Sequence, residues 1–413
     1  MVKMTRVASV TTLAGLALGM WMLAAQSPAE AKTTSDQAAA ILYWPKVVVD
    51  SANHTDTLIR LSNTNTSLQK QAHCYYIDAN SHCSNNPSQV CNGSCSGAGV
   101  CLQGWGEIDF DIVITRDQPL AWHASSGMHH GQFPLEVPGV CKLGPPFPCS
   151  ADFQCPAGPG GGCLLLPNNI GSGIPPVAED PFVGALICVQ YDPSANPPAP
   201  DQSLTTGNAL IGEATIERAI PAAAPAPAGV DLASYNAVGV RYKGGVETVP
   251  PGELHLDGVQ YESCPTTLIL DHQFDVVTGT EQQVTDLTLV PCGNNFLTQT
   301  PGSVTAQFVI FNEFEQRFST SNGVDCFFDK QLSRIDTVDP SRSIFTSSQA
   351  GTAVGQTRIR PVSSAATGRG VLGVAVYRQL GPTGLVGDAA YDLHQSGSLA
   401  PGSGTQPDVI TIP

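Results

Sequence analysis

The sequence predicts an all-β protein built as two tandem antiparallel β-sandwich domains of immunoglobulin-like type. Charged residues make up only 13% of the 413 residues, so helix formers such as Glu and Lys are scarce. The 41 Gly and 33 Pro supply turns at short intervals. Between these turns, short segments alternate apolar and polar residues, which is the period of a strand with one buried face. Many short strands with frequent turns favour a sandwich over a helical or α/β domain.

The N-terminus has the pattern of a secretory signal peptide. Lys3 and Arg6 precede an uncharged stretch at 7–25, and residues 29–31 read Ala-Glu-Ala, a small-x-small cleavage site. An uncleaved anchor is the competing interpretation, because the stretch could nearly span a bilayer, but Thr, Ser and Gly dilute it. We therefore expect residues 1–31 to be removed. The mature protein is expected in the periplasm, on the cell surface or outside the cell, without a membrane span.

The first predicted domain covers residues 38–250. Its strands are expected at 42–49, 57–61, 72–77, 108–115, 182–191, 209–216 and 235–242. Two irregular Cys-rich insertions interrupt them, at 80–104 and 139–181. The Ala/Pro run at 219–228 is interpreted as an extended loop or short linker.

The second predicted domain covers residues 263–413. Its strands are expected at 266–270, 284–290, 304–311, 324–329, 352–361 and 371–379. We place the domain break near 250–263, and a break at the Ala/Pro run is the alternative.

The two halves share a faint internal pattern. Residues 58–63 lead to a Cys-Tyr-Tyr run within 73–78, and residues 308–312 lead to a Cys-Phe-Phe run within 325–329. Either an ancient duplication or chance similarity between two β-rich segments explains the pattern.

Thirteen cysteines form the most informative set of residues, and all follow residue 31. Clustered cysteines persist as disulfides only in an oxidising compartment, and the odd number leaves at least one unpaired. Bridges are expected among Cys83, Cys91, Cys95 and Cys101, among Cys141, Cys149, Cys155 and Cys163, and as the pairs Cys74–Cys188 and Cys264–Cys292. In the repeat, Ile359 takes the place of Cys188, so Cys326 is expected to be a buried free thiol. The stapled insertions either present a binding surface or resist proteases.

The net charge of −16 argues against two classes of partner. Nucleic acid requires a basic surface that neutralises phosphate, and no basic cluster occurs. Anionic lipid is disfavoured for the same reason.

No catalytic motif is evident, and no cofactor or bound metal is expected. The sequence lacks Gly-x-Ser-x-Gly, His-Glu-x-x-His, Walker, EF-hand and Cys-x-x-Cys patterns. Weak candidates are a metal site at His123, His129 and His130 with Glu136 or Asp109, an acid–base pair Asp109 and Asp111, calcium ligands Asp271, Asp275, Asp336 and Asp339, and a sugar-stacking platform of Trp44, Trp105 and Trp122. A polar loop, a solvated strand face and core tryptophans are the competing explanations.

Four segments carry a resemblance to other proteins: residues 56–64, 74–79, 287–292 and 311–319. They resemble a family of uncharacterised secreted bacterial β-sandwich proteins, across most of the mature chain. The family has no known activity, so the resemblance implies export and architecture only. The stretch 141–163 also resembles short disulfide-knotted inserts of bacterial surface proteins.

These observations favour an exported, non-catalytic protein with a structural, adhesion or partner-binding role in the bacterial cell envelope or exterior. The alternative is a secreted carbohydrate-binding or carbohydrate-active protein, because sandwich folds host glycosidases without local motifs. A glycan-binding protein should expose Trp105 or Trp122 beside carboxylates in a groove. A structural module should bury both.

Overall fold

Strands make up most of the regular structure, as the alternating sequence requires. The computed structural model describes residues 33, 36–91, 94–102, 104–128, 139–141, 148–149, 163–164, 173–192, 199–220, 229–245, 249–362, 370–398 and 407–413. Strands account for 60% of the structure, with almost no helix. The chain divides into Met1–Ala31, which holds the expected signal peptide and lies outside the described residues, and Lys32–Pro413.

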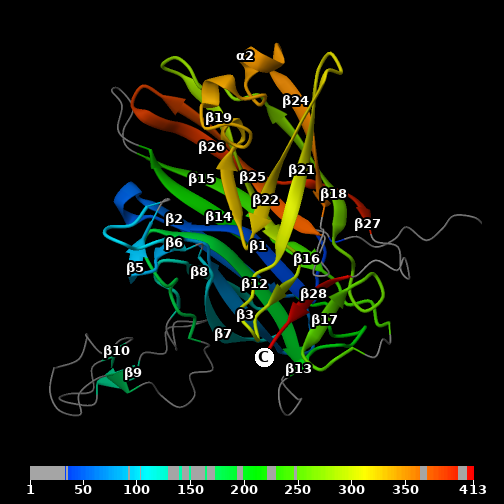
Figure 1. Cartoon of the computed structure of the whole chain (residues 1–413). Coiled ribbons are helices and arrows are strands. Elements are labelled where there is room, and N and C mark those ends of the chain that lie inside the picture. The colour runs from blue at the N-terminus through cyan, green and yellow to red at the C-terminus, as the bar shows by residue number, and fades with distance from the viewer. Residues whose placement is uncertain are drawn as a thin grey trace, which may run out of the picture. The chain divides into compact units, whose positions relative to one another are not determined.

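The central strands of the first sheet are buried on both faces, which explains why they are apolar. Its order is β16-β1-β12-β3-β7, with β13 paired to β12 (Figure 1). The bounds are β1 Ile41–Val49, β3 Lys70–Asp78, β7 Gly106–Ile114, β12 Phe182–Asp192, β13 Ala199–Pro200 and β16 Val238–Val240. Leu42 and Trp44 face one hydrophobic core, whereas Ile41 and Tyr43 face another. Successive residues of a strand point to opposite faces, so a strand between two cores is apolar on both faces.

The second sheet closes the first core with one face and exposes the other. Its order is β15-β14-β2-β8, with bounds β2 Thr55–Asn63, β8 Pro119–His123, β14 Leu210–Ile220 and β15 Gly229–Asn236. Ile59 and Leu61 of β2 are buried in this core, whereas Arg60 between them is exposed. This is the alternation expected of an antiparallel sheet with one solvated face.

Two further sheets enclose a third core. One has the order β22-β21-β24-β18-β27, and the other β23-β19-β25-β26. Their bounds are β18 Pro265–Gln273, β19 Gln282–Pro291, β21 Ser303–Asn312, β22 Arg317–Asp325, β23 Phe328–Gln331, β24 Val354–Val362, β25 Val371–Gly381, β26 Gly384–Asp392 and β27 His394–Ser398. Phe308 and Phe345 are fully buried between them.

A fifth sheet and two small ones complete the described strands. The order β17-β28-β20 covers the second core, and its bounds are β17 Glu253–Leu256, β20 Asn294–Asn295 and β28 Asp408–Thr411. The small sheets are β5-β4-β6, with β4 His82–Cys83, β5 Asn86–Val90 and β6 Cys101–Leu102, and β10-β9-β11, with β9 Gly139–Cys141, β10 Pro148–Cys149 and β11 Cys163–Leu164. The helical turns are the 3-10 segments Ser51–Asn53, Leu332–Arg334 and Pro340–Arg342, and α2 Ser347–Ala350.

The prediction of two tandem immunoglobulin-like β-sandwich domains is wrong, because the sheets are arranged in the manner of a five-blade β-propeller. The strand order departs from that of repeat propellers, whose blades consist of consecutive strands, since β14 here pairs with β2 and β12 with β3. Strands from both halves of the chain also share cores. Val374 and Val376 of β25 pack into the first core. In a pair of tandem domains, each domain would instead close its core with its own strands. Apolar alternation shows which face of a strand is buried but not against which sheet it packs, so the sequence could not separate these architectures.

Candidate functional site

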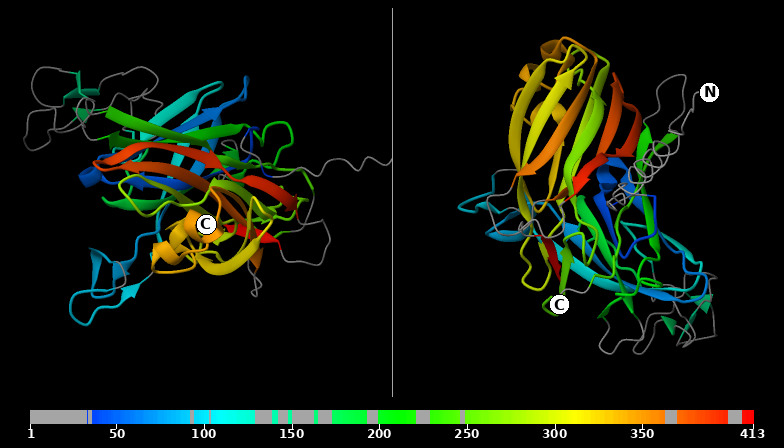
Figure 2. Two further views of the ribbon diagram at one scale, coloured as in Figure 1. Left: turned by 90° about the horizontal axis from the view of Figure 1, so that it is seen from above. Right: turned by 90° about the vertical axis from the view of Figure 1, so that its right-hand side faces the viewer.

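A disulfide-stapled loop projects from the larger sheets and is the most distinctive surface feature (Figure 2). It contains the small sheet β5-β4-β6 within the first Cys-rich insertion. The structure joins Cys83 to Cys95 and Cys91 to Cys101 across this loop. A loop with few buried apolar side chains gains its order from such bridges.

The other cysteines have separate roles in the cores. Cys74 on β3 is joined to Cys188 on β12, and Cys264 is joined to Cys292. Cys326 is free and buried, and its burial raises the pKa of the thiol to about 12, with Asp78 and Asp325 adding to the shift. The side chains of Cys141, Cys149, Cys155 and Cys163 lie outside the described residues.

Three ligand-type side chains converge at the base of the stapled loop. Asp78 ends β3, His82 begins β4, and Glu179 lies just before β12. One donor atom from each of the three lies within 4.8 Å of the other two. His82 Nε2 is 2.9 Å from Glu179 Oε2. Asn80 anchors the turn between them, because its backbone N–H donates to Asp78 Oδ1 at 2.9 Å and its side-chain amide donates to Glu179 Oε1.

Electrostatics make this cluster unusual. Asp78 is buried and 6% exposed, and burial raises the pKa of its carboxyl to about 6, with the Glu179 charge adding to the shift. Among the described residues, no Lys or Arg forms an ion pair with Asp78 or Glu179. His82 is the one basic side chain of the cluster, and a bound cation would add to its compensation of the two carboxyl groups. Sequence reasoning missed this cluster because Glu179 is 97 residues from His82, which leaves no local motif.

The predicted carboxylate pair forms part of an ionic cluster on β7. His73 on β3 lies between Asp109 and Asp111, with Nε2 3.5 Å from Asp109 Oδ2 and Nδ1 2.9 Å from Asp111 Oδ1. The carboxylate side chains are 59% and 57% exposed. Ions this exposed are well solvated, so the pair has the character of a strand face in contact with water.

The tryptophans do not form a platform. Trp44 and Trp122 belong to the first core, where Trp122 Nε1 donates to the Tyr76 hydroxyl at 2.7 Å. Trp105 is half-buried and stacks on Phe296, with ring centroids 5.9 Å apart. Trp122 therefore has the position of a core residue, and Trp105 packs against the second core.

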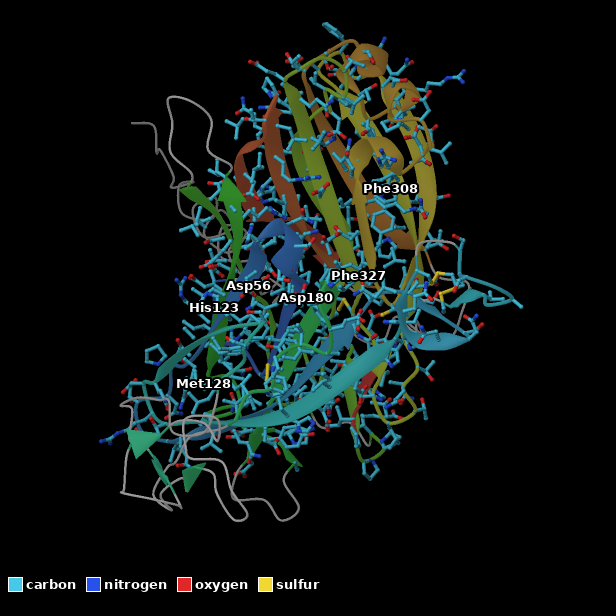
Figure 3. All side chains as sticks on the ribbon, turned by 90° about the vertical axis from the view of Figure 1, so that its left-hand side faces the viewer. Asp56, His123, Met128, Asp180, Phe308 and Phe327 are labelled. Carbon is cyan, nitrogen blue, oxygen red and sulfur yellow. A yellow bond between two sulfur atoms is a disulfide. The ribbon has the colours of Figure 1, made fainter. Side chains whose placement is uncertain are left out.

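The remaining predicted ligands do not converge where the structure describes them. His123 lies beside Glu217, at 3.3 Å, on the same sheet as Asp56 (Figure 3). His129, His130 and Glu136 lie outside the described residues. Each of the four candidate calcium ligands serves its own local hydrogen bonds: Asp271 accepts from Gln356, Asp275 from Thr285 and Ser333, Asp336 from Ser343 and Ile344, and Asp339 from Ser341.

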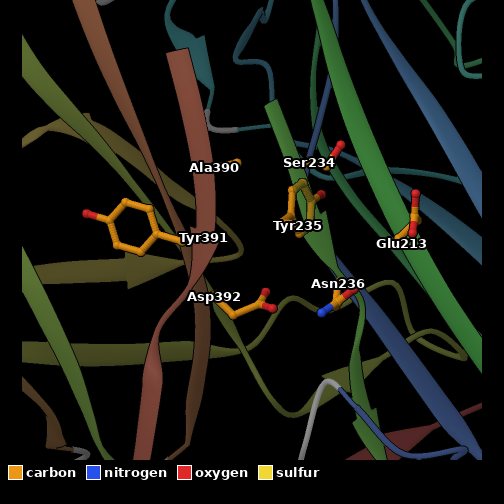
Figure 4. Close-up of a pocket in the computed structure, with 7 residues that line it drawn as sticks. All are labelled: Glu213, Ser234, Tyr235, Asn236, Ala390, Tyr391 and Asp392. Carbon is orange, nitrogen blue, oxygen red and sulfur yellow. The ribbon is translucent and has the colours of Figure 1, made fainter. Parts of the chain in front are cut away.

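A cavity of about 260 Å³ opens where β14 and β15 meet β26 (Figure 4). Its lining residues are Glu213, Ser234, Tyr235, Asn236, Ala390, Tyr391 and Asp392. Figure 4 shows Asn236 and Asp392 facing each other across it, whereas the Tyr391 ring points away. The Tyr235 hydroxyl is already engaged, because it donates to the Lys46 carbonyl. Glu213 pairs with Arg60, and Ser234 shares a hydrogen bond with Thr215.

No known protein family, curated protein or solved structure matches the chain. The resemblance to secreted bacterial proteins therefore stays a prediction. Over the residues that the structure describes, no helix is both long and apolar enough to cross a membrane.

Proposed function

We propose that the protein is exported and acts as a non-catalytic partner-binding protein of the bacterial cell envelope or exterior. Four disulfides among the described residues fit an oxidising compartment. The N-terminal signal pattern points to the same compartment. The buried position of Trp122 and the stacked position of Trp105 support the non-catalytic binding role over a tryptophan-based glycan platform.

The projecting stapled loop is the single observation that carries this proposal. Val100 on the loop is 63% exposed and Val90 is 39% exposed. Two disulfides hold these apolar side chains in place, so a partner would lose little conformational entropy in binding them. Rigid loops with apolar tips are a common means of partner recognition.

Photo-cross-linking on intact producing cells tests the proposal. A photoreactive residue at Ser94, which is exposed on the loop, should capture an envelope protein, and Val100→Asp should reduce that capture at least threefold. The matched control is the same photoreactive residue at Val338, which is 93% exposed and lies between two 3-10 turns of the other half. Equal capture from both positions, or none from Ser94, would contradict the proposal.

A carbohydrate-binding role is the second candidate, and the cavity beside β26 favours it. Carboxylate and amide side chains line this space, which is large enough for one sugar ring. Glycan-array binding that is lost in Asn236→Ala, with unchanged thermal stability, would support this role. Binding that survives the substitution would place any glycan contact elsewhere.

A further inference from the structure

The cluster of Asp78, His82 and Glu179 joins three separate segments at the base of the stapled loop. These segments are the end of β3, the start of β4 and the stretch before β12. Each side chain contributes one donor atom, and the three atoms lie within 4.8 Å of each other. A metal ion requires this kind of convergence, and three protein ligands are sufficient when water fills a fourth position.

The surroundings of the cluster supply negative charge without a basic counterpart. Asp78 is more than nine-tenths buried, and Glu179 has a side-chain exposure of 20%. No Lys or Arg within the described part of the chain pairs with either carboxylate, so His82 is their only possible cationic neighbour. A divalent cation would neutralise both carboxylates where a lone imidazolium could balance only one.

The neighbouring groups already orient the donors. Asn80 donates to Glu179 Oε1 and, at 2.8 Å, to the Pro181 carbonyl, so its amide ties the stapled loop to the segment that carries Glu179. Hydrogen bonds of this kind fix ligand orientation in metal sites. Glu179 Oε2 faces His82 Nε2 at 2.9 Å, and a metal ion would separate these two atoms as it bound between them.

We propose that Asp78, His82 and Glu179 bind one zinc ion, which fastens the base of the disulfide-stapled loop to the first sheet. One imidazole nitrogen and two carboxylate oxygens suit zinc, whereas calcium and magnesium prefer oxygen ligands alone. His82 directly precedes Cys83, so the metal and the Cys83–Cys95 bridge hold adjacent positions of the same loop. This site is independent of the partner-binding role, because it concerns how the loop is held and not what the loop binds.

Zinc titration of the full mature protein, after treatment with EDTA, tests the proposal. Isothermal calorimetry should show one zinc per chain, and His82→Gln or Asp78→Asn should weaken binding at least tenfold. His255→Gln is the matched control, because His255 also lies beside a glutamate, Glu253, at 2.8 Å. Among the described residues, that pair belongs to no group of three metal-ligand side chains. This control should bind zinc as the wild type does.

A structural measurement keeps the proposal testable if Asp78→Asn fails to fold. A crystal grown with zinc should give an anomalous peak between His82 and Glu179, and Glu179→Gln should abolish it. Absence of zinc binding, binding unchanged in His82→Gln, a peak at another position, or calcium binding tighter than zinc would each overturn the proposal.

Discussion

Lys46 shows how a single side chain links the two halves of the chain. Its ammonium group is buried, with 3% side-chain exposure, and lies 2.6 Å from Asp329 Oδ1 and 3.2 Å from Thr288 Oγ1. Lys46 is on β1, and Asp329 is on β23. A buried charge that loses its partner is strongly destabilising.

Asp329→Asn should therefore lower the free energy of unfolding by about 2–4 kcal/mol, less than for a fully buried pair because Asp329 is a quarter exposed. Urea denaturation measures the loss. The comparison is Glu213→Gln, which breaks the exposed pair with Arg60 and should cost under about 1 kcal/mol. Equal effects of the two substitutions would contradict the prediction.

His272 should make the protein sensitive to acid. The side chain is buried, its Nε2 lies 2.9 Å from Thr357 Oγ1, and burial lowers the pKa of the imidazole to about 4. The unfolded chain takes up the proton near pH 6.5, before the folded chain does, so stability is lost as the pH falls from about 6.5 to about 4. Wild type should lose about 3 kcal/mol relative to His272→Gln over this range. Urea denaturation at several pH values measures the free energy of unfolding of both proteins. A difference between them that does not change with pH would refute the prediction.

At the scale of elements, the disulfides divide into those that join core strands and those that shape a loop. Cys74 and Cys188 face each other on the paired strands β3 and β12, and 114 residues separate them in the sequence. The bridges at Cys83–Cys95 and Cys91–Cys101 close short segments of the projecting loop.

Removal of the Cys74–Cys188 bridge by double Ala substitution should therefore cost about 3–5 kcal/mol of global stability, because it frees a long loop in the unfolded chain. The double variant of Cys83 and Cys95 should leave the global unfolding midpoint nearly unchanged and make the loop sensitive to proteases. Thermal denaturation and limited proteolysis distinguish these outcomes. A larger loss of global stability on removal of the Cys83–Cys95 bridge than on removal of the Cys74–Cys188 bridge would contradict the prediction.

At the scale of the whole molecule, the shared cores make the strands of both halves depend on one another. Val376 of β25 is fully buried in the first core, and Arg218 of β14 pairs with Asp388 of β26, whose side chain is 0% exposed. An all-or-none transition is expected where no part can close its core alone.

Calorimetry of the mature chain should accordingly give one unfolding transition with equal calorimetric and van't Hoff enthalpies. Val376→Ala should speed amide exchange in β2 and β14, which belong to the other half of the sequence. Two separated transitions, or exchange changes confined to β19, β25 and β26, would show that the halves unfold independently.

The sequence predicted strands far better than it predicted their partners. The expected strand at 72–77 lies inside β3 and the one at 182–191 lies inside β12, because alternating burial is a local property. Pairing depends on contacts between distant residues, as in β14 beside β2, and the alternation of apolar residues holds no record of them. The proposed repeat shows the same limit. Asn63 and Asn312 both close turns by accepting backbone N–H groups. The chain after Asn312 returns as β22 beside β21, whereas the chain after Asn63 continues as β3 in a different sheet from β2.

The candidate zinc site could not be predicted for a related reason. His82 and Asp78 lie close in the sequence but form no recognised ligand spacing, and Glu179 joins them only through the pairing of β3 with β12. Of the histidines clustered at 123–130, His123 lies within the described residues, beside Glu217. Ligands from separate strands become visible only in the fold.

The free thiol of Cys326 can report conformational opening of the folded protein. The thiol is 4% exposed, and with a pKa of about 12 it is almost entirely protonated at pH 8, so an alkylating reagent reacts only with molecules that have opened. Its alkylation rate under native conditions, followed on the peptide that contains Cys326, would measure how often the surrounding core opens, without any engineered label. Burial also prevents the Cys326 thiol from exchanging with the native disulfides while the chain stays folded.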